Sequence, residues 1–211
     1  MPLFFDTNMP IGYIFKWDPW HAYVLNVVEE KDSKYWSVTV EKESYRKFKH
    51  FRKNYIDLLY LLWHELKRND GFSTKKNLFK ISESYKRLDD KKKRIVLNSI
   101  WNNEGFSYKE SNSKLASTFD SIITSFHIDT ETRKKDFRKL VQLHKRTKNY
   151  PEIKSQLKKR LHSPDDDIIL DAHDLCFKIP DLEIVTADGK LDVDCIKSQT
   201  IIKTITFLKD Y

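Results

Sequence analysis

The sequence predicts an α/β fold in which a mostly parallel sheet packs between helices and a separate helical subdomain is inserted. Strand-like apolar segments lie near both ends of the 211-residue chain, and amphipathic helices separate them. The helical block at residues 44–162 is too long for one crossover between parallel strands, so it must contain the extra subdomain. Only 4 Gly and 6 Pro are present, which leaves little room for long coil segments.

The first elements follow from the apolar pattern. Residues 2–5 are apolar without alternation, which predicts a short buried strand. Short helices are expected at 9–16 and at 19–30, and the second begins at an Asp-Pro pair. Residues 35–40 are aromatic and β-branched and predict a second strand.

A long amphipathic helix is expected from Glu41. Its apolar residues recur at steps of three and four, and its other face is basic. The same periodicity predicts five further helices, at 76–88, 91–103, 113–127, 131–148 and 152–162.

The last part of the chain returns to alternating helix and strand. Ser163 as the cap and Pro164 as the first helical residue predict a helix with an acidic first turn. Residues 182–186 and 201–208 are rich in apolar and β-branched residues and predict the last two strands.

Charge is distributed unevenly along the chain, although the net charge is only +8. Residues 44–162 contain 30 Lys and Arg against 13 Asp and Glu, whereas the remainder contains 9 against 18. A basic surface of this size is typical of polyanion binding, although solvated helix faces give the same composition. We therefore expect a core formed by residues 1–48 and 163–211, and a basic helical insertion at 49–162 that binds nucleic acid.

Several other functional classes are disfavoured. The chain has no glycine-rich phosphate loop, no evident signal peptide and no apolar run near the ~20 residues of a membrane span. Cys176 and Cys195 form neither a disulfide framework nor a zinc pair, and the 7 histidines lack metal-site spacing. We expect reduced thiols and a cytoplasmic protein without membrane contact.

Four carboxylates fall at equivalent places in the expected elements. Asp6 ends the first strand, and Asp188 follows the strand that ends at Thr186. Glu43 and Asp166 lie in the first turns of helices. In a parallel sheet these positions share one edge, where ligand sites form. Each acid alone is better explained by a helix start or a turn, but together they predict a cluster that needs Mg²⁺ or Mn²⁺.

The motifs around these acids occur in a familiar order. An apolar strand leads into Asp6-Thr7-Asn8, and Ser37 is followed six residues later by Glu43. The last motif is Val185-Thr186-Ala187-Asp188. This order resembles the PIN domain family of metal-dependent nucleases, which includes VapC-type toxins, and the matched segments cover roughly residues 1–45 and 163–208.

The third motif of that family is an Asp followed three residues later by Ile. Asp166 with Ile169 fits this spacing, and Asp165 with Ile168 fits almost as well. The chain departs from the family's small members in the long stretch between its second and third acids. Another departure is Asp171, which is either a fifth acid near the site or an exposed helix residue.

The resemblance implies a PIN-like three-layer sandwich and a ribonuclease that uses one or two Mg²⁺ or Mn²⁺ ions to activate water. The implied metal ligands and catalytic residues are Asp6, Glu43, Asp166 and Asp188. Residues expected to support these ligands are Thr7, Asn8, Thr186, Asp165 and Asp171. Contacts with the RNA backbone are expected from Arg46, Lys49 and Lys53.

The sequence leaves three other functional interpretations open. A nucleic-acid-binding or scaffold protein would keep the fold without cleaving. A phosphohydrolase of the haloacid dehalogenase type also begins with a strand and Asp, but it needs a second Asp where this chain has Asn8. A toxin held by a protein antitoxin would refine the nuclease reading. The expected partners are accordingly RNA or single-stranded DNA, an antitoxin, or a second copy of the chain.

Overall fold

The computed structural model describes residues 1–211, which form two compact units. The first unit contains Met1–Ile14, Trp20–Lys47 and Arg133–Tyr211, and the second contains Phe15–Pro19 and Phe48–Thr132. The expected boundary at residue 162 is therefore wrong, because the thirty residues before it belong to the first unit. None of the helices combines the length and the apolar character that crossing a membrane requires.

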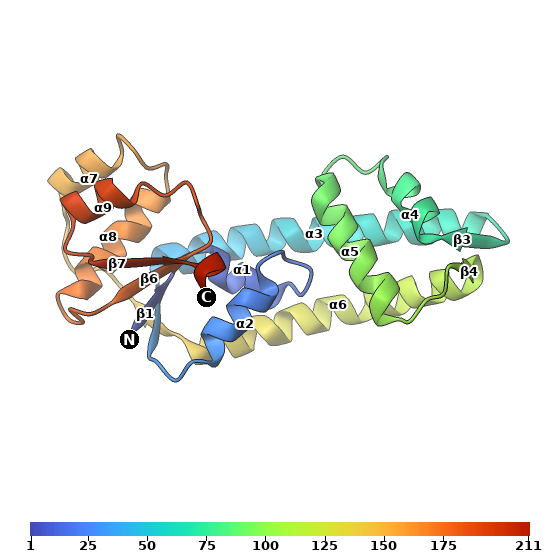
Figure 1. The fold of residues 1–211 in the computed structure, drawn as a ribbon, viewed down its shortest axis with the longest axis horizontal. Coiled ribbons are helices and arrows are strands. Elements are labelled where there is room, and N and C mark those ends of the chain that lie inside the picture. The colour runs from blue at the N-terminus through green and yellow to red at the C-terminus, as the bar shows by residue number, and fades with distance from the viewer. The chain divides into compact units, whose positions relative to one another are not determined.

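The first unit is built on a five-stranded sheet with the order β5-β2-β1-β6-β7. Figure 1 labels β1, β6 and β7 of this sheet. Its strands are β1 (Leu3–Phe5), β2 (Lys34–Ser37), β5 (Gln142–His144), β6 (Glu183–Thr186) and β7 (Thr204–Phe207). All neighbouring strands pair in parallel, which confirms the predicted α/β class. The chain adds β2 and β5 on one side of β1 and then β6 and β7 on the other. Strand order therefore reverses between β1 and β6.

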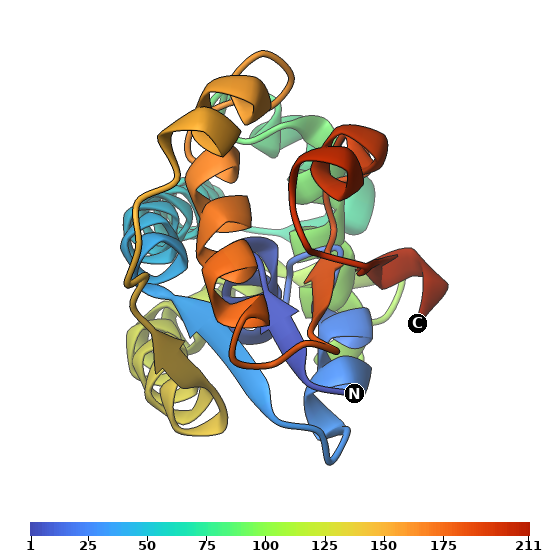
Figure 2. The same ribbon diagram turned by 90° about the vertical axis from the view of Figure 1, so that its left-hand side faces the viewer.

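Helices cover both faces of this sheet, and Figure 2 shows α8 in front of the strands and α1 behind them. The helices that lie wholly in the first unit are α1 (Asn8–Ile14), α2 (His21–Glu29), α7 (Pro151–Leu157), α8 (Asp165–Cys176), α9 (Val193–Gln199) and the 3-10 helix η1 (Leu208–Asp210). The first turns of α3 (Val38–Arg68) and the last turns of α6 (Asn112–Leu140) also belong to it.

The core of the first unit is centred on β1. Leu3, Phe4 and Phe5 are at most 1% exposed, because this strand lies inside the sheet with helices on both faces. That position explains why its sequence is apolar without alternation. A close approach of α1 and α2 depends on Gly12, since a Cβ atom there would lie 2.8 Å from Cγ2 of Val24.

The second unit is helical, apart from a two-stranded antiparallel sheet. It contains α4 (Lys75–Ser82), α5 (Asp90–Asn103) and the strands β3 (Phe72–Thr74) and β4 (Lys109–Ser111), together with parts of α3 and α6. Aromatic rings fill its interior, where Trp17 stacks on Phe126 at a centroid distance of 5.0 Å.

Two of the expected elements differ near the site. Residues 38–40 were expected in a strand but form the first turn of α3, because the Ser37 hydroxyl accepts the Val40 N–H at 3.2 Å and caps the helix. The helix that follows Ser163 begins at Asp165, and Pro164 is the residue before it. No side chain caps that helix.

Further differences concern the middle of the chain. The helices expected at 113–127 and 131–148 are one helix, α6, which ends at Leu140. It is followed by β5, an edge strand of three residues that the sequence pattern did not indicate. The helix α9 and the small sheet of β3 and β4 were not expected either.

Candidate functional site

A cavity of about 450 Å³ opens at the carboxyl ends of β1 and β6, where the strand order reverses. Asp6 enters it directly after β1, and Asp188 enters it two residues after β6. Glu43 comes from the first turns of α3, and Asp165 is the first residue of α8. Four acids from distant parts of the sequence thus line one cavity at the sheet edge where open α/β sheets bind ligands.

Asp6 is held by donors on both of its oxygens. The backbone N–H of Asn8 donates to Oδ1 at 2.9 Å, and the Asn8 amide donates to Oδ2 at 3.2 Å. The Thr186 hydroxyl also donates to Oδ2, and it accepts the N–H of Asp188 at 3.0 Å. Burial raises the pKa of Asp6 to about 6, although these hydrogen bonds and the charge of Lys47 act in the opposite direction.

Glu43 has protein partners on both oxygens as well. The Thr7 hydroxyl donates to Oε2 at 2.5 Å, and the Lys47 ammonium lies 2.9 Å from Oε1. The pair joins residues one helical turn apart on α3, and Glu43 is only 8% exposed. Thr7 therefore supports the second acid of the cluster and not the first.

The three consecutive acids at the start of α8 have three different environments. Asp165 lines the cavity, and burial together with the charges of Glu43 and Asp188 raises the pKa of Asp165. Asp166 does not line the cavity; it is 0% exposed, and neither of its oxygens accepts a hydrogen bond. Asp165, and not the expected Asp166, is thus among the residues that line the cavity, and successive helical residues point about 100° apart.

Asp167 and Asp171 belong to a different face of α8. Asp167 pairs with Lys154 at 2.6 Å and with Arg146 at 3.1 Å, and Arg146 also lies 3.3 Å from Asp171. One turn further on, Asp174 accepts hydrogen bonds from the segment 144–150. Asp171 is therefore a buried partner of Arg146, and the expectations of a fifth site acid or an exposed residue are both wrong.

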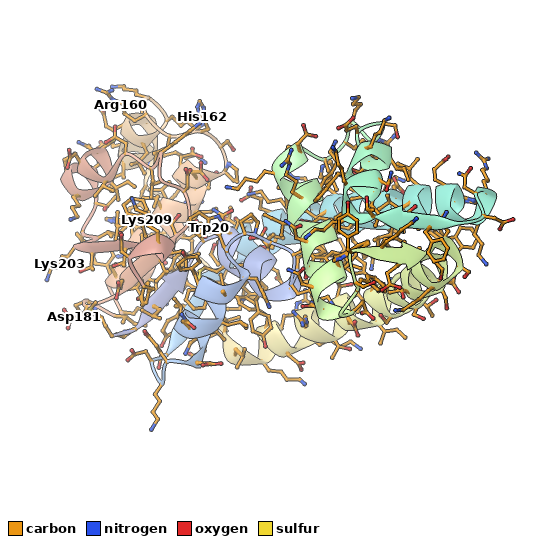
Figure 3. All side chains as sticks on the ribbon, turned by 45° about the vertical axis from the view of Figure 1, so that its right-hand side comes forward. Trp20, Arg160, His162, Asp181, Lys203 and Lys209 are labelled. Atoms are coloured by element: carbon orange, nitrogen blue, oxygen red, sulfur yellow. The ribbon has the colours of Figure 1, made fainter.

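Cations and an aromatic ring complete the walls of the cavity. Arg46 and Lys47 line it, and Lys42 lines an adjoining groove that also includes Arg46. Trp20, labelled in Figure 3, lines the cavity from the residue before α2. Of these residues, Lys47 and Lys42 were not singled out from the sequence. The spacing of Glu43 and Lys47 suits an ion pair on a helix, but such pairs are common on solvated surfaces.

Lys49 and Lys53, the other two expected phosphate contacts, lie on the part of α3 that belongs to the second unit. Lys53 pairs with Asp57 at 2.8 Å, one turn along the same helix. Arg46 is therefore the only one of the three expected cations that lines the cavity.

The acids of the cavity offer carboxylate oxygens, which are the ligands that Mg²⁺ and Mn²⁺ prefer. This donor set fits a hard divalent cation better than zinc, which favours nitrogen and sulfur. No three acidic, histidine or cysteine side chains of the structure are gathered as metal ligands. The carboxylates of Asp6 and Glu43 are instead each held by donors of the protein.

The chain was also compared with known proteins. No family model matches it, and no curated protein or solved structure matches it significantly. The function is therefore inferred from the site itself.

Proposed function

We propose that this protein is a metal-dependent ribonuclease with a PIN-like core, which hydrolyses phosphodiester bonds of RNA. The observation that carries the proposal is the meeting of four acids in one cavity at the point where strand order reverses. These acids are Asp6, Glu43, Asp165 and Asp188. A cluster of this kind is costly unless cations compensate it, and a divalent ion beside a phosphate does so.

Asp6, Asp165 and Asp188 are the residues that would hold a Mg²⁺ or Mn²⁺ ion. When bound, such an ion polarises a phosphate oxygen and makes water a stronger nucleophile at neutral pH. Thr186 and Asn8 fix the orientation of Asp6 through their hydrogen bonds. Thr186 also accepts the backbone N–H of Asp188, so one hydroxyl links the residue after β1 to the segment after β6.

The surroundings of the acids suit a nucleic acid substrate. Arg46 is exposed at the rim, and with Lys42 it lines a groove that continues from the cavity. These two cations are placed to contact phosphates on the strand that flanks the cleaved bond. Trp20 gives the cavity one aromatic wall against which a base can stack.

The phosphohydrolase alternative is less well supported by the same contacts. That reaction needs a carboxylic acid two residues after the first Asp, where this chain has Asn8. The Asn8 side chain donates to Asp6 at 3.2 Å and therefore acts as a support for that carboxylate. It has no acidic proton to give to a leaving group.

Two neighbouring substitutions test the proposal sharply. Purified protein is incubated with labelled RNA or single-stranded DNA in Mn²⁺ or in EDTA. We expect RNA cleavage in Mn²⁺ only, and Asp165→Asn should reduce its rate by about 100-fold or more. Asp166→Asn removes the same charge from the adjacent residue outside the cavity, and it should cleave nearly as fast as the wild type.

The possible outcomes separate the alternatives. Cleavage that persists in EDTA or in Asp6→Asn would refute a metal-dependent nuclease. Loss of cleavage in Asp166→Asn but not in Asp165→Asn would refute the site as assigned, provided that thermal melting shows both variants folded. Salt-sensitive RNA binding without any cleavage would favour the nucleic-acid-binding alternative.

A further inference from the structure

Lys47 is a cation that lines the acidic cavity and pairs with one of its acids. Its side chain is 36% exposed, and its ammonium lies 2.9 Å from Oε1 of Glu43. The other oxygen of Glu43 accepts the Thr7 hydroxyl at 2.5 Å. Both oxygens of this acid are therefore occupied by groups of the protein.

The influence of Lys47 extends beyond its ion pair. Its charge acts on the carboxylates of Asp6 and Asp165 as well as on Glu43. These three acids come from β1, α8 and α3. A single ammonium group is thus the common counter-ion of acids that three different elements bring to the cavity.

We infer that Lys47 serves as the resident cation on the Glu43 side of the cavity, so that the site binds one divalent ion instead of two. Asp6, Asp165 and Asp188 would hold that ion, and Glu43 would position Lys47. This inference rests on the proposed function and deepens it, because it fixes the number of metal ions and gives Glu43 a role other than metal binding.

Charge balance favours this arrangement. The four acids carry four formal negative charges, and one divalent ion together with Lys47 and Arg46, which also lines the cavity, compensates all four. A second divalent ion beside the ammonium would meet strong like-charge repulsion in a partly buried site. An ammonium group has three donors, and the bond to Glu43 leaves two for the oxygens of a substrate phosphate.

The experiment counts bound Mn²⁺ on the full chain without RNA, by electron paramagnetic resonance of the free ion and by calorimetry. We expect the wild type to bind one Mn²⁺. Lys47→Met frees Glu43 and removes the repulsion, so it should bind a second ion or bind the first about tenfold more tightly. Lys47→Arg keeps the charge and should bind one ion, as should Glu43→Gln.

Lys178→Met is the control, because it removes the same charge from an exposed residue of the same unit that does not line the cavity. It should leave Mn²⁺ binding unchanged. The inference is overturned if the wild type binds two ions or none, or if Lys47→Met and Lys178→Met bind Mn²⁺ alike. A wild type that binds one Mn²⁺ but cleaves no RNA would overturn the nuclease proposal and leave the role of Lys47 supported.

Discussion

Replacing Asp6 by Asn should make the metal-free protein more stable at neutral pH. The side chain follows the central strand, and burial raises its pKa from the ordinary value of 3.8 to about 6. The folded state therefore disfavours the ionised carboxylate. Below pH 3.8 Asp6 is protonated in both the folded and the unfolded state, so it does not lower the free energy of unfolding. As the pH rises from 3.8 through 6, the unfolded state ionises more readily, and stability is lost.

The size of the effect follows from the two pKa values. Their difference corresponds to about 3 kcal/mol above pH 6, at about 1.36 kcal/mol for each tenfold change. Asp6 is half-buried, so water screens part of this penalty, and we expect about 1–2 kcal/mol. Asn keeps the shape of the side chain without the charge, but its amide nitrogen would face a donor whose hydrogen bond Asp6 now accepts, so Asn should recover only part of that amount.

The assay is urea denaturation of wild type and Asp6→Asn from pH 5 to pH 8, in EDTA and in Mn²⁺. In EDTA the advantage of the variant should grow with pH. In saturating Mn²⁺ the order should reverse, because an ion at 100 times its dissociation constant adds about 2.7 kcal/mol to the wild type alone. A variant that is less stable than the wild type in EDTA at pH 8 would refute the reasoning about burial.

Two further predictions concern the surroundings of the site. Gly12→Ala should destabilise the protein by about 1–3 kcal/mol in urea denaturation, because the new methyl group would lie 2.8 Å from Val24. Alanine normally favours a helix interior, so an increase in stability would show that α1 and α2 separate freely. Arg46→Ala in the Asp6→Asn background should weaken RNA binding and lower the slope of log K against log salt by about 1, as measured by fluorescence anisotropy. Lys178→Ala, an exposed control on the same unit, should leave that slope unchanged.

The sequence predicted the elements whose character is decided locally. β1 could be recognised because a central strand buried on both faces is apolar throughout. β5 could not, because it is an edge strand of three residues and Leu143 within it is 54% exposed. The long helices were found from their apolar faces, but where α6 ends depends on a strand pairing with β2 that no local pattern shows.

Part of the candidate site could likewise be predicted from the sequence, and part could not. Asp6 and Asp188 follow strands directly, so their position at the sheet edge needs only the order of elements. The choice among Asp165, Asp166 and Asp167 depends on how α8 is turned about its axis. Contacts with residues far away in the chain decide that, and spacing alone leaves two of the three acids nearly equivalent.

The ion pairs on the far side of α8 therefore have a consequence for the site. Asp167, Asp171 and Asp174 recur at four and three residues, so they form one stripe that is clamped to segment 144–154. This clamp fixes the rotational phase of the helix. A turn of the helix by one residue would bring Asp166 toward the sheet edge in place of Asp165. Arg146 and Lys154 thus hold α8 in one orientation about its axis. Without them the helix could rotate, and the carboxylate that lines the cavity would no longer be fixed.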